Sequence, residues 1–273
     1  MTPTPFLKMH GLGNDFVVID GRRNAVDLNE ARTQAIADRR KGIGCDQLIV
    51  IEPAKNRLAD AFMRIRNADG GEVEACGNGA RCVADLLMRE SGRDHVVIET
   101  VVGLLDAEAA GDGRVSVDMG LARLDWREIP LARAMATLHL DVAVGPLKDG
   151  VGVNIGNPHA VFFVADAESI DLAALGPVLE RHPLFPERAN IEAASLLAPN
   201  KVRVRVWERG VGITRACGTG ACASLVASAR RKLTGRMAEI VLDGGSLDVE
   251  WLADDHVRMT GPVATSFTGE LPV

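Results

Sequence analysis

The chain has 273 residues, of which 47% are hydrophobic and 25% charged, so it is long enough to bury the cores of two ordinary domains. Its net charge of −6, with no basic run or aromatic-interleaved basic patch, argues against a nucleic-acid-binding protein. The N-terminal segment lacks the apolar core of a signal peptide, no apolar stretch could span a membrane, and five cysteines fit reduced thiols better than disulfides. We therefore expect a cytoplasmic protein that binds neither nucleic acid nor membrane.

Strand-like segments dominate the chain. Residues 61–66 and 201–207 alternate apolar and charged side chains, as half-buried strands do. Other expected strands are short β-branched runs, at residues 16–20, 48–52, 95–100, 114–119, 160–164, 238–243 and 247–251. Expected helices cover residues 29–41, 79–90, 171–181 and 220–233. This order predicts an α+β fold with mixed or antiparallel sheets, and the uncharged segment 216–229 is expected to form a helix enclosed by a sheet.

One short motif occurs twice, as EACGNGARC at residues 74–82 and as RACGTGACA at residues 215–223. Each copy places a cysteine, Cys76 or Cys217, just before a predicted helix, where we expect a lowered pKa and thiolate character. The glycines let the backbone turn tightly, and the helix N-terminus favours an anion. Each motif therefore offers a base together with backbone N–H groups for a carboxylate, from Gly77 and Asn78 in one copy and from Gly218 and Thr219 in the other.

Other polar residues repeat around these motifs in the same order. In each half, one asparagine is followed 33 positions later by a second amide residue, which is Gln47 after Asn14 and Asn190 after Asn157. A third polar residue, Asn67 or Glu208, precedes the cysteine of the motif by nine positions. The matched residues are Asn14 and Asn157, Gln47 and Asn190, and Asn67 and Glu208. Several equal spacings predict two duplicated halves, which we place at residues 1–120 and 121–261.

Two such motifs suit a reaction that inverts a carbon acid. Facing each other across an interdomain cleft, one thiolate would remove the α-proton while the opposite thiol supplies another. The backbone N–H groups would stabilise the negative charge that spreads onto the substrate carboxylate. This chemistry explains why one protein would carry the motif twice.

The chain resembles the diaminopimelate epimerase family in blocks that run nearly from end to end. They are KMHGLGNDFVVID, GIGCDQL, RIRNADGGEVEACGNGARC, NIGNPHAVF, FPERANIE, RVWERGVGITRACGTGACA and DGGSLDVEW. The resemblance implies two pseudo-symmetric halves, each a mixed sheet wrapped round a central helix, with the C-terminal strand at about 262–273 returning to the first half. It also implies cofactor-independent, metal-free conversion of LL- to meso-diaminopimelate in lysine and peptidoglycan precursor synthesis, by a cytoplasmic homodimer.

The same resemblance implies residue roles. Cys76 and Cys217 would be the paired acid and base, and His159 and Glu208 would support them. The substrate-binding residues would be Asn14, Gln47, Asn67, Gly77, Asn78, Asn157, Asn190, Glu208, Arg209, Gly218 and Thr219.

Simpler interpretations compete with these roles. A lone cysteine is most often a small buried hydrophobic residue, which is our interpretation of Cys45, Cys82 and Cys222. Asparagines beside Gly, Asp or Pro commonly form turns, His159 follows an ordinary turn opening, and Glu208-Arg209 is compatible with a solvated surface pair. The matched spacing and the family blocks favour the functional roles.

Three other functions remain as alternatives. Four cysteines could form a metal-binding module, although the usual Cys-x₂-Cys spacing is absent: Cys76, Cys82, Cys217 and Cys222. A redox switch would use a Cys76–Cys217 disulfide. Among enzymes, the nearest alternative is a proline or hydroxyproline racemase, against which the blocks HGLGNDF and GNPH favour diaminopimelate.

Overall fold

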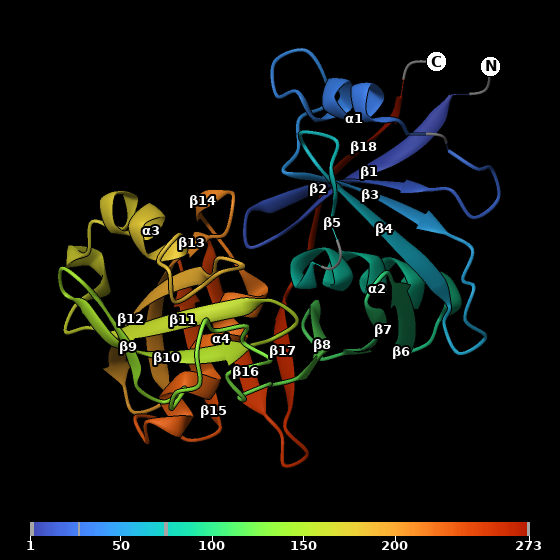
Figure 1. The fold of residues 1–273 in the computed structure, drawn as a ribbon. Coiled ribbons are helices and arrows are strands. Elements are labelled where there is room, and N and C mark those ends of the chain that lie inside the picture. Colours follow the sequence, from blue (N-terminus) through green and yellow to red (C-terminus); the bar gives the residue numbers. More distant parts are fainter. Residues whose placement is uncertain (1–2, 27, 74–75, 272–273) are drawn as a thin grey trace. The chain divides into compact units, whose positions relative to one another are not determined.

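The chain divides into two compact units (Figure 1). The computed structural model describes residues 3–26, 28–73 and 76–271, so Glu74 and Ala75 of the first motif lie outside the described residues. Unit 1 comprises residues 1–117 and 260–273, and unit 2 comprises residues 118–259. Within the described ranges, no helix has the length and apolar character of a membrane span.

Unit 1 is built on a mixed sheet. Strand β2 pairs with β1 antiparallel and with β3 parallel, β4 pairs with β3 antiparallel and with β6 parallel, and β18 pairs with β1. The elements are β1 (Thr4–Gly11), β2 (Asn14–Asp20), α1 (Glu30–Ala37), β3 (Gln47–Glu52), β4 (Ala61–Asn67), β5 (Glu72–Val73), α2 (Gly77–Ser91), β6 (His95–Thr100), β7 (Gly103–Ala109), β8 (Arg114–Leu121) and β18 (Ala264–Leu271). The last described strand of the chain thus belongs to the first unit.

Unit 2 repeats this topology. Strand β11 pairs with β10 antiparallel and with β12 parallel, and β13 pairs with β12 antiparallel and with β15 parallel. The elements are β9 (Leu140–Val144), β10 (Leu147–Asn154), β11 (Pro158–Phe163), a 3₁₀ turn (Ala167–Ser169), α3 (Leu172–Glu180), β12 (Asn190–Ala198), β13 (Lys201–Glu208), β14 (Gly212–Thr214), α4 (Gly218–Arg230), β15 (Met237–Leu242), β16 (Gly245–Trp251) and β17 (His256–Pro262). The shared order of parallel and antiparallel pairs shows that the two units are pseudo-symmetric.

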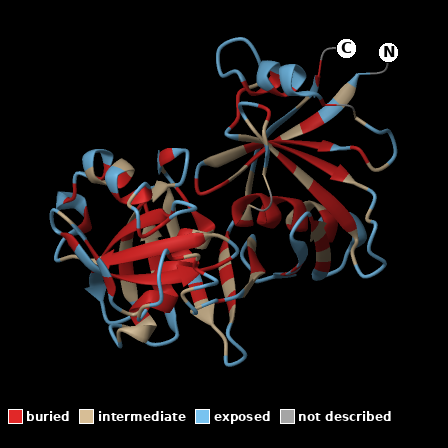
Figure 2. Ribbon diagram, in the orientation of Figure 1, coloured by how far each residue is buried: buried red, intermediate tan, exposed pale blue. Residues whose placement is uncertain are grey.

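A helix lies against the sheet in each unit. Helix α4 contacts β10, β11, β12, β13, β15 and β16, and nearly all of its residues are buried, as Figure 2 shows. This confirms the prediction that the uncharged segment forms a helix enclosed by a sheet, and the helix ends one residue beyond that segment, at Arg230. In unit 1, helix α2 packs on β1, β2, β6 and β7, and most of its hydrophobic residues are buried.

The four predicted helices are present with small differences in their ends. Helices α2 and α4 each begin two residues earlier than predicted, at Gly77 and Gly218. Glycine is a weak helix former, so propensity alone places the start too late. The cysteine side chain caps the first turn instead and lets the helix begin immediately after it.

Candidate active site

Both repeated cysteines are N-caps of long helices. Cys76 precedes α2 and Cys217 precedes α4, and both have extended backbone conformations, with φ of −146° and −113°. The Cys76 thiol accepts a hydrogen bond from the Gly79 N–H at 3.4 Å, and the Cys217 thiol accepts one from the Gly220 N–H at 3.4 Å. Each sulfur therefore lies at a helix N-terminus, where backbone N–H groups stabilise negative charge.

The turns that lead to the first asparagine of each unit also match. Gly13 precedes Asn14 with φ of 81°, and Gly156 precedes Asn157 with φ of 86°. Glycine adopts this left-handed conformation without the steric penalty of a side chain. The same backbone turn therefore delivers an asparagine to the start of strand β2 in unit 1 and to the residue before β11 in unit 2.

In unit 1 the structure brings Cys76 together with two predicted substrate-binding residues. Asn14 Oδ1 accepts a hydrogen bond from Asn78 Nδ2 at 3.1 Å and lies 3.8 Å from Cys76 Sγ. Asn78 Oδ1 in turn accepts one from Arg81 Nη2 at 2.8 Å. Because Asp46 Oδ2 accepts from Asn14 Nδ2 at 3.0 Å, the orientation of the Asn14 amide is set from both ends.

Gln47 and Asn67 form a second polar pair in unit 1. They face each other across β3 and β4, and Gln47 Nε2 donates to Asn67 Oδ1 at 3.0 Å. Gln47 Oε1 is buried and has no hydrogen-bond partner among the described residues. A buried acceptor without a partner is costly, so this atom is suited to a ligand that supplies an N–H group.

In unit 2 the thiol lies among carboxyl groups. Burial raises the pKa of the Cys217 thiol well above its ordinary value, and the negative charges of Glu208 and Glu192 raise it further. Thr219 Oγ1, 3.5 Å from the sulfur, and the Gly220 N–H oppose this shift. The expectation of a lowered pKa is therefore wrong for Cys217, because burial and like charge outweigh the helix N-terminus.

Glu208 itself is held against the same turn. Burial raises the pKa of its carboxyl above the ordinary value, while hydrogen bonds from Thr214 and from Cys217 lower it. Thr214 Oγ1 donates to Glu208 Oε1. These contacts place the Glu208 carboxyl beside the Cys217 thiol and argue against a solvated surface pair.

His159 is fully buried and bridges two side chains. Its Nε2 lies 2.8 Å from Asn157 Oδ1, and its Nδ1 lies 2.6 Å from Glu192 Oε1. Burial raises the pKa of the Glu192 carboxyl, and His159 opposes the shift. His159 therefore supports Asn157 through one ring nitrogen and a buried carboxyl group through the other.

Asn190 and Arg209 are joined through the backbone. Asn190 Oδ1 accepts from the Arg209 N–H at 2.9 Å, and Asn190 Nδ2 donates to the Pro158 carbonyl at 2.9 Å. The Arg209 side chain is exposed and donates from Nη1 to the Glu187 carbonyl at 3.1 Å. The Asn190 amide thus fixes the loop that presents the Arg209 guanidinium.

The sequence analysis did not identify two charged residues near the repeated cysteines, Arg81 in unit 1 and Glu192 in unit 2. Both side chains are fully buried, at 0% exposure. Glu192 lies 33 positions after His159, the spacing already seen from Asn157 to Asn190 and from Asn14 to Gln47. That repeated spacing would have identified Glu192. Arg81 had no comparable signal, because position 81 corresponds to Cys222 in the other motif.

The remaining cysteines are buried, as predicted. Burial raises the pKa of Cys45 to about 11 and that of Cys82 to about 12, and Cys222 is fully buried. None of the five cysteines, all of which lie among the described residues, forms a disulfide in the structure. Within the part of the chain that the structure describes, no group of three or more His, Cys, Asp or Glu side chains is arranged to hold a metal ion.

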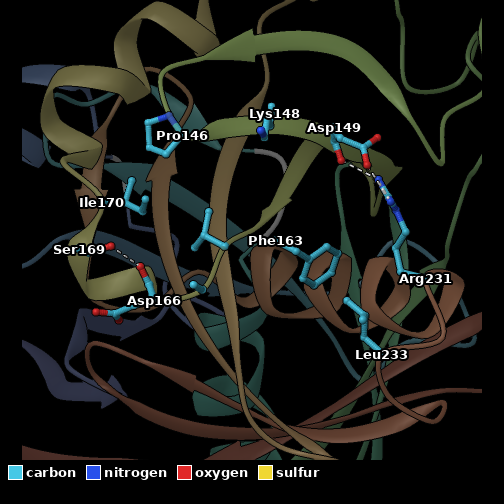
Figure 3. Close-up of a pocket in the computed structure, with 11 residues that line it drawn as sticks. Pro146, Lys148, Asp149, Phe163, Asp166, Ser169, Ile170, Arg231 and Leu233 are labelled. Carbon is cyan, nitrogen blue, oxygen red and sulfur yellow. Dashed lines mark hydrogen bonds and ion pairs between the residues drawn. The ribbon is translucent and has the colours of Figure 1, made fainter.

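A pocket of about 620 Å³ lies elsewhere in unit 2 (Figure 3). Phe163 and Leu233 line it together with Lys148, and Asp149 forms an ion pair with Arg231 at 2.9 Å on its border. It contains none of the predicted site residues.

Solved structures of other proteins share this fold. The chain matches a phenazine biosynthesis protein of the PhzF family from Bacillus anthracis with a TM-score of 0.70, at 15% identity and with 100% of both chains covered. A probable proline racemase from Agrobacterium radiobacter K84 also matches, with a TM-score of 0.70, at 16% identity and with 99% of this chain and 93% of the other covered. These likenesses confirm the predicted α+β fold with two pseudo-symmetric units.

Sequence relatives define the family within this fold. The family model described as Diaminopimelate epimerase matches residues 6–124 and 151–266. A diaminopimelate epimerase from Rhodospirillum centenum is 62% identical, over 97% of this chain and 91% of that protein. The chain therefore belongs to the diaminopimelate epimerase family, as its sequence blocks predict.

Proposed function

We propose that this protein converts LL-2,6-diaminopimelate to the meso isomer without a cofactor, with Cys76 and Cys217 as paired acid and base. The observation that carries this proposal is the thiol that caps a helix at the equivalent point of each pseudo-symmetric unit. Membership of the family supports the choice of substrate. The reaction would serve lysine and peptidoglycan precursor synthesis.

The proposed chemistry requires one thiol at each face of the α-carbon. A thiolate takes the α-hydrogen, so that a C–H bond breaks and an S–H bond forms. The other thiol delivers its proton to the opposite face, which inverts the centre and leaves a thiolate. Backbone N–H groups of the two turns stabilise the charge that develops on the carboxylate, from Gly77, Asn78, Gly218 and Thr219.

Further residues would hold the substrate and tune the thiols. The amides of Asn14, Gln47, Asn67, Asn157 and Asn190 suit the ammonium and carboxylate groups of a diamino diacid. Arg209 offers a planar guanidinium that can bind a carboxylate with two parallel hydrogen bonds. Glu208 would act beside Cys217 while also binding substrate, and His159 would act through Asn157.

The setting of the enzyme is part of the proposal. We infer that residues 1–120 and 121–261 each supply one thiol and that the enzyme acts as a homodimer in the cytoplasm. Its partner is a small-molecule substrate, with neither nucleic acid nor membrane required.

Isotope incorporation tests the two-base mechanism. In deuterated water, early meso product formed from LL-diaminopimelate should carry solvent deuterium at the inverted centre, while recovered substrate stays almost unlabelled. Reversal returns the hydrogen held by the same thiol, and only the opposite thiol carries a solvent-derived atom. Product that keeps most of its original hydrogen would show a single base and refute the pairing.

A further inference from the structure

Glu192 is a buried carboxyl group to which the proposed chemistry gives no part. Its Oε1 lies 2.6 Å from His159 Nδ1, and its Oε2 has no hydrogen-bond partner among the described residues. The carboxyl also lies against the turn that carries the thiol. A Cβ atom on Gly220 would sit 3.1 Å from Glu192 Oε1 and 3.3 Å from Cys217 Sγ. Burying such a group is expensive unless it has a function or a strong partner.

Unit 1 shows that the fold does not require a polar pair at the place that His159 and Glu192 occupy in unit 2. Strand pairing places Phe16 opposite Gln47 in unit 1 and His159 opposite Asn190 in unit 2. Ile49 and Glu192 each follow two residues later along the second strand of the pair.

Phe16 and Ile49 are an apolar pair that lies against the turn carrying the Cys76 thiol. A Cβ atom on Gly79 would sit 2.8 Å from Ile49 Cδ1 and 3.6 Å from Phe16 Cε1. An apolar pair therefore fills in unit 1 the place that His159 and Glu192 fill in unit 2.

Proton placement in the pair follows from its acceptors. Asn157 Oδ1 is a carbonyl oxygen and can only accept, so His159 Nε2 carries a proton and donates it. A second proton must lie between His159 Nδ1 and Glu192 Oε1, because two bare acceptors would repel at 2.6 Å. Burial raises the pKa of Glu192, so this proton stays on Oε1 and the carboxyl group donates it to His159 Nδ1. Neutral His159 then accepts at Nδ1 and carries its own proton on Nε2.

We propose that Glu192 is a positioning residue of the Cys217 unit. By sharing a proton with His159 Nδ1, it keeps the Nε2–H directed at Asn157 Oδ1. The Asn157 amide is then fixed with its carbonyl inwards, which leaves both N–H groups of Nδ2 available for a substrate carboxylate. In unit 1 the equivalent Asn14 is oriented differently, by Asn78 and Asp46.

Two substitutions separate positioning from charge, in a test that rests on the proposed function. Glu192→Gln retains a hydrogen bond, because its amide N–H can donate to His159 Nδ1, and KM for diaminopimelate should stay within about threefold. Glu192→Ile, which copies Ile49, removes the partner and should raise KM roughly ten- to a hundredfold with a smaller change in kcat. Ser195→Ala, which deletes another buried hydrogen bond of strand β12, is the matched control and should stay within about twofold.

The kinetic result can overturn the proposal in two ways. An unchanged KM in Glu192→Ile would show that Asn157 needs no help from the carboxyl group. A KM raised as much by Gln as by Ile would show that charge, not position, is what matters.

Nitrogen NMR of the histidine rings gives a second readout that needs no substrate. The His159 signals are assigned by their absence from a His159→Phe variant. In Glu192→Gln we expect a protonated Nε2 and an unprotonated Nδ1, and in the unsubstituted protein a proton at Nε2 and a strongly shifted Nδ1. An unprotonated Nε2 in either protein would overturn the proposal. A protein with the expected ring signals but no epimerase activity would refute the proposed function and leave the assignment of Glu192 intact.

Discussion

Units 1 and 2 place a cysteine at the same point of the same topology, yet they surround it with different chemistry. In unit 1 the Asn14 amide oxygen lies 3.8 Å from Cys76 Sγ and also accepts from the Asn78 amide. The thiol of Cys217 in unit 2 instead lies near two carboxyl groups, Glu208 and Glu192. The duplicated backbone supplies the helix cap and the turn N–H groups. Side chains from neighbouring strands then set the charge around each sulfur.

This difference suits a reaction that needs an acid and a base at once. A single fold obtains two roles from two similar groups by giving them different environments. Buried carboxyl groups favour the protonated form of Cys217, which is the form that can deliver a proton. The comparison between the units therefore makes predictions about what each one contributes.

Exchanging either cysteine for serine should have the largest effect, because the proposed mechanism takes one group from each unit. Cys76→Ser and Cys217→Ser replace the thiol with a hydroxyl, which is a much weaker acid and gives up its proton far less readily, so each should lower kcat about 10²- to 10⁴-fold in both directions. Conversion of each isomer is followed by chiral chromatography. Cys45→Ser, at a buried cysteine outside the motifs, is the control for thiol loss as such. If either motif variant keeps near-normal activity, the two units do not act as a pair.

Removing Arg81 tests the cation found only in unit 1. Arg81→Met removes the fully buried guanidinium that donates to Asn78 Oδ1 and should lower the free energy of unfolding by about 2–3 kcal/mol. Urea denaturation measures the change. Arg89→Met on the same helix is the control, since Arg89 forms an exposed pair with Asp85 and should matter by less than about 0.5 kcal/mol. Equal effects of the two variants would show that Arg81 does not organise the Cys76 turn.

The sequence predicts the repeated parts of this molecule better than the parts that differ. The caps at Cys76 and Cys217 could be located because the glycine turn and the spacing occur twice. Strand β12, NIEAASLLA, was not predicted, because its alanines and leucines have no β periodicity and it is a strand through pairing with β11 and β13. The sequence did not indicate that Arg81 and Glu192 are buried, because charged residues are mostly exposed. Arg81 donates to Asn78 in the same helix turn, and Glu192 pairs with His159 on the neighbouring strand.

Arg209 is a proposed recognition group of unit 2, and Ala68 holds the corresponding place in unit 1. Arg209→Lys should lower kcat/KM roughly ten- to thirtyfold, because a point charge cannot replace the planar fork. Steady-state kinetics with diaminopimelate measure the loss. Arg188→Lys, at an exposed arginine of the same unit, should stay within about twofold. Near-normal kinetics for Arg209→Lys would favour the alternative interpretation, in which Arg209 is a solvated surface residue.

The smallest expected effect concerns the charge around Cys217. Because Glu208 raises the pKa of that thiol, Glu208→Gln should lower it. At pH 8 a lower pKa means more thiolate, so iodoacetamide should modify Cys217 roughly three- to tenfold faster, as measured by mass spectrometry. The rate at Cys76 in the same sample should not change, since that thiol belongs to the unit with amide neighbours. Glu180→Gln is the matched control, because its buried carboxyl accepts from Trp207 Nε1 at 2.7 Å instead of facing the thiol. A slower or unchanged rate at Cys217 in Glu208→Gln would show that burial alone controls this thiol and that the two units differ less in charge than in solvent access.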